Sequence, residues 1–206
     1  WGNIAGVIEL LHKIARKEGI GAILSEGSRE AAKKFGKGTE EFVVEVKGLE
    51  APMHDPRGFH GMGLAYMTSI RGACHLMHFA EPVEQGMNTF AEAGFQENYI
   101  GQTSDGKAEM IKLCEDLGLP CNSLVICEFV AWTLSANELA EMVAVTTDFD
   151  FTMKDLLACG ERTWFLKRGL GNMMGMHAKD DRLPQRILTP LKEGSAAGSV
   201  PDVEKL

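Results

Sequence analysis

The chain has 206 residues, of which 45% are hydrophobic and 24% are charged. This is enough for one large domain, or for one domain with part of another, and it excludes a disordered tail. The 29 acidic and 21 basic residues give a formal net charge of −8, which argues against a nucleic-acid-binding module because such a module needs a basic face. No stretch approaches the roughly eighteen consecutive apolar residues that read as a membrane span.

The chain begins at Trp1 rather than at a methionine, and a helical pattern follows at once. No charged segment followed by an apolar segment indicates a signal peptide. We therefore expect the chain to be a piece of a longer polypeptide.

Five cysteines are present, an odd number, and no pair has the C-x-x-C spacing. A disulfide framework of the secreted type is therefore not expected, and we predict a cytoplasmic protein. Taken singly, each cysteine is first interpreted as a small buried hydrophobe. A single cysteine can still be one ligand of a cluster whose other ligands lie elsewhere. The cysteines are Cys74, Cys114, Cys121, Cys127 and Cys159.

The first third of the chain predicts two helices and a connector. Helical spacing begins after Asn3, the expected N-cap, and ends at Gly19, the expected C-cap. A second helix is expected over residues 22–35, and the β-branched run at 42–46 predicts a short strand or an extended connector. Residues 47–61 contain two prolines and three glycines, which are typical of a loop, so we place a domain boundary there.

The middle of the chain predicts further helices. They are expected over residues 63–75 and 104–117, and Pro120 is expected to open a new element. Residues 124–134 are nearly all apolar and are long enough for a buried helix.

Two capping patterns mark helices in the last third. Residues 135–138 form a capping box before a helix over 136–146, and residues 152–155 begin a long helix. Gly160 lies inside that helix, where glycine costs about 1 kcal/mol relative to alanine, so we expect close packing against another element. After residue 180 the chain becomes irregular, and the whole reads as mainly α with one short strand.

Several polar residues suggest a site. His75 and His78 are three positions apart and would share a helical face, a spacing that can bind a metal but more often is structural. Arg71, four positions before His75, would lower the imidazole pKa and favour a general base or an anion-orienting site. The alternative is that Arg71 fixes a loop carboxylate. Residues 55–57 are interpreted as a turn with an internal ion pair.

An ordered set of segments is more specific than any single motif. In this order they resemble the C-terminal part of the aldehyde:ferredoxin oxidoreductase family, over nearly the whole chain. The segments are Leu24-x-Glu26-Gly27, Val46-Lys47-Gly48-Leu49-Glu50, His54-Asp55-Pro56-Arg57, Gly63-Leu64-x-Tyr66-x-Thr68-Ser69-x-Arg71-Gly72-Ala73-Cys74-His75, Gly160-Glu161-Arg162 and Asp180-Asp181-x-Leu183-Pro184-x-Arg186.

The resemblance implies a mainly α fold made of the multihelical C-terminal domains of that family. Residues 1–46 would end the helical middle domain, and residues 47–206 would form the helical C-terminal domain. The N-terminal β domain that binds the pterins would lie outside this chain.

The resemblance also implies an activity. Members of the family carry a tungsten bis-pterin, for which molybdenum is the alternative metal, and one [4Fe-4S] cluster. They oxidise aldehydes to carboxylic acids with ferredoxin as the electron acceptor. The expected partners are the missing N-terminal part of the polypeptide, ferredoxin, the aldehyde substrate and a second copy in a homodimer. We expect the fragment alone to be inactive.

The site residues implied by the resemblance lie between residues 122 and 127. This segment is similar to a D-x-x-G-L-C motif, which makes Cys127 the fourth cluster ligand, with the other three upstream. Asn122 stands where the family has an aspartate that hydrogen-bonds the pterin, and backbone groups at Ile126 and Cys127 would face the cofactor. A rival alignment uses Asp116 and Cys121 and leaves Pro120 inserted before the cysteine.

His75 matches a family histidine beside the tungsten, where it would orient substrate or relay a proton. Two positions later some members carry a lysine, and here Met77 stands instead. Asn122 lacks the charge of aspartate, and Val125 replaces a glycine. The changes at positions 122 and 125 favour the alternative function, a diverged or truncated relative that acts as a cofactor-free interaction domain.

Overall fold

The structure is a computed structural model that describes residues 2–88 and 90–206. Trp1, from which the sequence predicted a longer polypeptide, lies outside the described residues. The α-helices are α1 (Ile4–Arg16), α2 (Ile20–Leu24), α3 (Ser28–Phe35), α4 (His60–Thr68), α5 (Ala80–Glu84), α6 (Lys107–Leu124), α7 (Glu128–Ala131), α8 (Ala136–Thr147) and α9 (Met153–Met173).

The strands β1 (Glu45–Val46) and β2 (Leu49–Glu50) form a small antiparallel hairpin, with Val46 opposite Leu49. Lys47 and Gly48 connect them, both with positive φ (53° and 88°), as a tight two-residue hairpin turn requires. Short 3-10 turns add η1 (Thr39–Phe42), η2 (Ala91–Ala93) and η3 (Ala178–Asp180). The predicted mainly α fold is confirmed.

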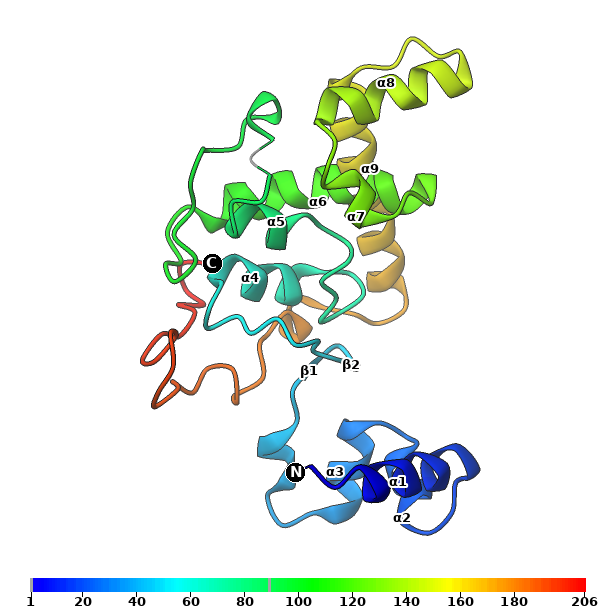
Figure 1. Cartoon of the computed structure of the whole chain (residues 1–206), viewed down its shortest axis with the longest axis vertical. Coiled ribbons are helices and arrows are strands. Elements are labelled where there is room, and N and C mark those ends of the chain that lie inside the picture. The colour runs from blue at the N-terminus through cyan, green and yellow to red at the C-terminus, as the bar shows by residue number, and fades with distance from the viewer. Residues whose placement is uncertain (1, 89) are drawn as a thin grey trace.

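The helices form two groups joined by the hairpin (Figure 1). The first group contains α1, α2 and α3, which contact one another in sequence order. In the second group α4 is buried along almost its whole length, and α6 packs against α4, α5 and α9. The C-terminal segment returns past α4 (Figure 1). No helix in the described part of the chain is long and apolar enough to cross a membrane.

Two predictions for the first group of helices were wrong. Asn3 does cap α1, accepting from the Gly6 amide at 3.0 Å, but the helix ends at Lys17 in the left-handed region rather than at Gly19. The helix expected over 22–35 is divided into α2 and α3, because Gly27 adopts a φ of 88° that no helix contains.

Three predicted boundaries in the second group were also wrong. The helix expected over 63–75 ends at Thr68, since Gly72 adopts a φ of 99° and lies against the carbonyl of Val46 in the hairpin. Helix α6 continues through Pro120 to Leu124. The helix expected over 124–134 is replaced by a tight turn and the single turn of α7. By contrast, both predicted capping boxes are confirmed at the starts of α8 and α9.

Helices α6 and α9 cross at their backbones. Pro120 has no N–H, so the carbonyl of Asp116, four residues earlier, loses its partner within α6. Gly160 of α9 packs against this carbonyl, and a Cβ atom added at Gly160 would lie 1.9 Å from the Asp116 oxygen. Only glycine fits there, which confirms the close packing predicted from its position inside a helix.

Each end of α4 is held by a charge of the sign that favours the helix dipole. At the N-terminus, the Glu84 carboxylate accepts from the amides of Gly61 (3.1 Å) and Met62 (3.0 Å) and pairs with buried Lys107 at 2.5 Å. Burial acts to raise the pKa of Glu84, and Lys107 and the two amides oppose it.

At the C-terminus of α4, Lys47 donates to the carbonyls of Met67 and Ser69. Its ammonium also pairs with Asp181 at 2.7 Å, and Asp181 pairs with Arg168 of α9 at 2.7 Å. Burial lowers the pKa of Lys47 while Asp181 opposes that change. Through Lys47 the hairpin, α4, α9 and the loop after α9 are tied together.

We expect Gly160→Ala to destabilise the protein by about 1–3 kcal/mol or more, because the added methyl group forces α6 and α9 apart. This outweighs the roughly 1 kcal/mol that alanine gains over glycine in a helix. Gly169→Ala on the same helix is the control, since open space surrounds Gly169 and the substitution should stabilise. Urea unfolding measures both, and a stabilised Gly160→Ala variant would contradict the crossing.

A second prediction concerns Glu115 on α6, whose side chain is buried between α4 and α9. Burial raises its pKa to about 7, although the nearby Trp164 and Thr68 side chains oppose the shift. An unfolded glutamate titrates near pH 4.3, so the folded state holds one more proton between these values. The free energy of unfolding should therefore fall as the pH rises from about 4.3 to about 7 and level off above.

Glu115→Gln should remove this part of the pH dependence and should stabilise the protein most above pH 7. Urea unfolding from pH 4 to pH 8 measures the slope. The exposed Glu97→Gln is the control, and an unchanged slope in Glu115→Gln would refute the assignment.

Candidate functional site

His75 lies in the irregular segment between α4 and α5, where it stacks on His54. The ring centroids are 4.5 Å apart with planes at 30°. His54 Nδ1 lies 3.2 Å from Glu81 Oε1 of α5, and the His54 carbonyl accepts from the buried Tyr66 hydroxyl at 3.1 Å. Helix α4 therefore positions His54, and His54 positions His75.

Burial lowers the pKa of His75, and the charge that His54 can carry lowers it further, while Glu81 acts in the opposite direction. His75 is consequently neutral at pH 7 and can accept a proton. The predicted role of Arg71 was wrong, because α4 ends before both residues and they share no helical face. Arg71 Nη1 instead lies 3.8 Å from Cys74 Sγ.

His78 has a structural role rather than a metal-binding one. Its Nε2 lies 2.9 Å from the Cys74 carbonyl, and its Nδ1 accepts from the Ala80 amide at 3.3 Å. Complete burial lowers its pKa to about 4. Across residues 2–88 and 90–206, no three His, Cys, Asp or Glu side chains are placed to hold a metal ion.

The end of α6 forms a Schellman motif. The Ile126 amide donates to the Cys121 carbonyl at 3.0 Å, and the Val125 amide donates to the Asn122 carbonyl at 3.3 Å. Val125 adopts a φ of 59°, a left-handed conformation that disfavours a β-branched residue, and 90% of it is exposed. Valine thus keeps the backbone path that a glycine would allow without strain.

Cys127 follows this turn as the exposed N-cap residue of α7. The cysteine of the rival alignment, Cys121, is buried inside α6, where burial raises its pKa to about 12 and its thiol faces the Leu117 carbonyl at 3.6 Å. Asp116 of that alignment is held by Lys112 at 2.5 Å. Of the two aligned segments, only the one that ends in Cys127 reaches the surface.

Asn122 connects this turn to the segment that carries His75. Its Nδ2 donates to the carbonyls of Leu76 (3.1 Å) and Gly118 (3.3 Å) and to Glu128 Oε1 (3.4 Å). Burial raises the pKa of Glu128 to about 8, although the Asn122 bond opposes the shift. The other oxygen, Glu128 Oε2, is buried with no hydrogen-bond partner in the described chain.

The sequence predicted four site residues: His75, Asn122, Ile126 and Cys127. The structure places Asn122, Ile126 and Cys127 on one turn, and Asn122 joins this turn to the loop that carries His75. Sequence reasoning did not single out His54 or Glu128, although His54 opens a quoted motif and Glu128 follows Cys127. The predicted ion pair within residues 55–57 is confirmed, with Arg57 and Asp55 at 2.7 Å.

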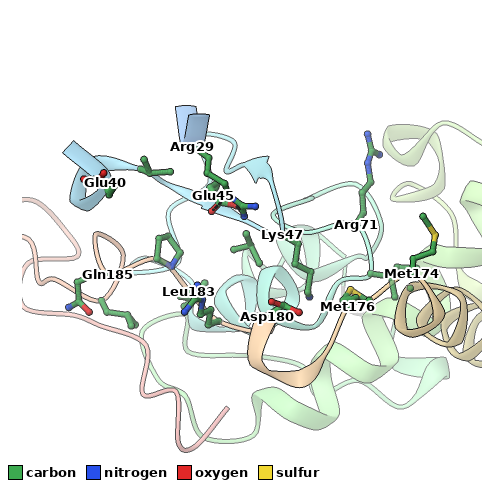
Figure 2. A pocket seen from close by; sticks show the side chains of 18 of the residues that line it. Arg29, Glu40, Glu45, Lys47, Arg71, Met174, Met176, Asp180, Leu183 and Gln185 are labelled. Atoms are coloured by element: carbon green, nitrogen blue, oxygen red, sulfur yellow. Dashed lines mark hydrogen bonds and ion pairs between the residues drawn. The ribbon is translucent and has the colours of Figure 1, made fainter. Parts of the chain in front are cut away.

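A separate groove of about 890 Å³ lies between η1, the hairpin and the loop after α9. Figure 2 shows Lys47 reaching from the hairpin toward this loop and Arg71 extending away from Lys47. The groove lining mixes charges of both signs, including Arg29, Glu45 and Asp180. None of the four predicted site residues lines it.

The exposed turn fits one edge of a cluster and cofactor site but not a whole one. A [4Fe-4S] cluster takes four cysteine thiolates, and Cys127 is the one exposed cysteine of the described residues. The turn also offers the Ile126 carbonyl, the Cys127 backbone amide and the side-chain oxygen of exposed Asn122, whose NH₂ group is already used. The Ile126 amide is already used in the Schellman motif.

The described chain is mainly helical, and its exposed Cys127 lies on a turn that the Asn122 side chain joins to the segment carrying His75. A family model described as aldehyde ferredoxin oxidoreductase, domains 2 and 3, matches residues 1–206. The chain belongs to the aldehyde ferredoxin oxidoreductase family.

Curated relatives agree with the family model. The tungsten-containing aldehyde ferredoxin oxidoreductase of Pyrococcus furiosus is 35% identical over 96% of this chain and 32% of its own length. That of Pyrococcus abyssi is 36% identical over 97% of this chain and 32% of its length. An aliphatic sulfonate oxidoreductase, WOR-like subunit, of P. furiosus is 29% identical over the whole chain and 31% of its length. The chain spans about a third of the relatives' length.

We expect Val125→Gly to stabilise the protein by about 1–2 kcal/mol, since it relieves the left-handed strain and loses almost no packing. Val145→Gly is the control. This valine is also exposed but lies inside α8, where glycine lowers helix stability by a fraction of about 1 kcal/mol. The midpoint of thermal unfolding should rise in Val125→Gly and fall in Val145→Gly. A destabilised Val125→Gly variant would contradict the strain.

Proposed function

We propose that the chain is the C-terminal portion of a tungsten-pterin, iron–sulfur oxidoreductase that oxidises aldehydes to carboxylic acids with ferredoxin as the acceptor. The observation that carries the proposal is the turn itself, where the exposed Cys127 and Asn122 meet the His75 loop through the bond from Asn122 to the Leu76 carbonyl. In this proposal residues 1–46 end the middle domain and residues 47–206 form the C-terminal domain.

A further part of the same polypeptide would complete the site. The relatives are about three times as long as this chain, and one exposed thiol needs three more to bind a cluster. Helix α1 supports this proposal, because it buries none of its residues and exposes Ile4, Val7 and Leu11. Apolar patches of this kind mark interfaces. On α9, Phe165 and Leu166 are similarly exposed.

In the loaded enzyme the tungsten or molybdenum bis-pterin and the [4Fe-4S] cluster would supply the redox chemistry. Cys127 would bind the cluster as a thiolate, and Asn122 and the Ile126 carbonyl would accept hydrogen bonds from the pterin. Burial and His54 lower the pKa of His75, so its imidazole would be in the neutral form. In that form it would orient the substrate and could accept a proton. The five free cysteines support a reducing, cytoplasmic compartment.

A second candidate is a cofactor-free interaction domain. Two observations favour it: Asn122 lacks the charge of the expected aspartate, and Val125 is strained where the family has glycine. Anaerobic expression of the complete polypeptide, followed by measurement of tungsten, molybdenum and iron, separates the two candidates. About four irons and one tungsten or molybdenum per chain support the enzyme; a metal-free, folded polypeptide supports the interaction domain.

We expect Cys127→Ser to lose most of the cluster iron from the complete polypeptide, because serine is not the thiolate ligand that the cluster takes. Cys121→Ala is the matched control and should keep its iron, since Cys121 is buried inside α6. Iron content and the visible absorption of the cluster measure the effect. Full iron in Cys127→Ser, with loss in Cys121→Ala, would favour the rival alignment.

A further inference from the structure

We infer, on the basis of the proposed function, that Glu128 is a positioning residue: it turns the Asn122 amide so that Oδ1 faces the cofactor. The aspartate that the family resemblance leads us to expect at position 122 would not suit the carbonyl acceptors around the Asn122 side chain. The pair of Asn122 and Glu128 therefore replaces the aspartate as a unit.

The orientation of the Asn122 amide follows from its neighbours. The Leu76 carbonyl, the Gly118 carbonyl and Glu128 Oε1 all lie within 3.4 Å of Nδ2. All three are acceptors, so the NH₂ group must face them. Oδ1 then points to the other side, where the side chain is exposed and no donor among the described residues contacts it.

An aspartate at position 122 would place a second oxygen against the Leu76 and Gly118 carbonyls, which can only accept, with no hydrogen between them. Such contacts are repulsive, and the acceptors would lose their donor. Asparagine shares its two N–H hydrogens among them and still presents one acceptor oxygen outward. The cofactor edge that meets Oδ1 should accordingly carry an N–H donor, as a pterin amino or ring N–H group does.

Glu128 also closes the turn that presents the thiol. Asn122 precedes the left-handed residue Val125, and Glu128 follows Cys127. The hydrogen bond between the Asn122 and Glu128 side chains therefore links the two ends of the exposed segment. Glu128 Oε2 is buried without a partner, which leaves Oε1 as the oxygen that acts on Asn122. One side chain thus fixes both the acceptor oxygen and the backbone that carries Cys127.

The test is a double-substitution cycle in the complete polypeptide, with tungsten and released pterin measured per chain and with thermal unfolding of the cofactor-free form. Glu128→Gln keeps an acceptor for Asn122 and should retain cofactor within two-fold, whereas Glu128→Ala should lose at least five-fold. Asn122→Asp should also lose at least five-fold. The exposed Glu141→Gln on α8 is the control and should change nothing.

The decisive variant is Asn122→Asp combined with Glu128→Gln, because the glutamine amide can donate to the new carboxylate. It should recover part of the cofactor that Asn122→Asp alone loses and raise the unfolding midpoint above that of Asn122→Asp, while the Leu76 and Gly118 carbonyls still face an acceptor oxygen. A merely structural Glu128 predicts no such recovery of pterin.

Two outcomes would overturn the inference, and they are distinct. If the wild type is loaded and Asn122→Asp is loaded equally well, Glu128 has no positioning role although the proposed function stands. If the wild type holds neither tungsten nor pterin, the proposed function fails, and the cofactor role of Glu128 fails with it, whatever the unfolding cycle shows.

Discussion

The backbone contact between α6 and α9 is the constraint on which the rest of the structure depends. Pro120 frees the Asp116 carbonyl, and Gly160 is small enough to receive it. With α6 fixed in this way, Lys107 at its start meets Glu84, and Asn122 at its end meets the segment that carries His75. A shift of α6 would move both, so the packing of a glycine decides the geometry of the candidate site.

Charged side chains at the two ends of α4 hold this helix in place. Helix α4 is short and buried, and its two ends are satisfied by side chains from distant parts of the sequence, Glu84 with Lys107 and Lys47 with Asp181. Buried pairs of this kind are costly to break because one partner is left charged and unpaired. Tyr66 of α4 then carries this rigidity to His54 and so to His75.

The sequence was most informative where the deciding interactions are local. The capping boxes at residues 135–138 and 152–155 act within one turn of helix, and both were predicted correctly. Gly160 was also interpreted correctly, since a glycine inside a helix needs a reason. The end of α4 was missed because Gly72 turns the chain to meet the hairpin, which is a tertiary contact.

The candidate site shows the same limit. Arg71 and His75 were expected on one helical face, and that expectation failed with the boundary of the helix. Glu128 was missed because its contact with Asn122 exists only when Val125 takes the left-handed conformation. The cluster and cofactor roles of Cys127, Ile126, Asn122 and His75 stay predictions that rest on family resemblance together with this geometry.

The ion pair between Lys47 and Asp181 has a consequence for folding kinetics. The two residues lie far apart in the sequence, and closing so long a loop delays the contact during folding. Until the loop after α9 arrives, Lys47 has the Met67 and Ser69 carbonyls as partners but lacks a carboxylate, so the hairpin is less stable at that stage. During synthesis on the ribosome, the hairpin would therefore reach its full stability only after the loop that carries Asp181 has emerged.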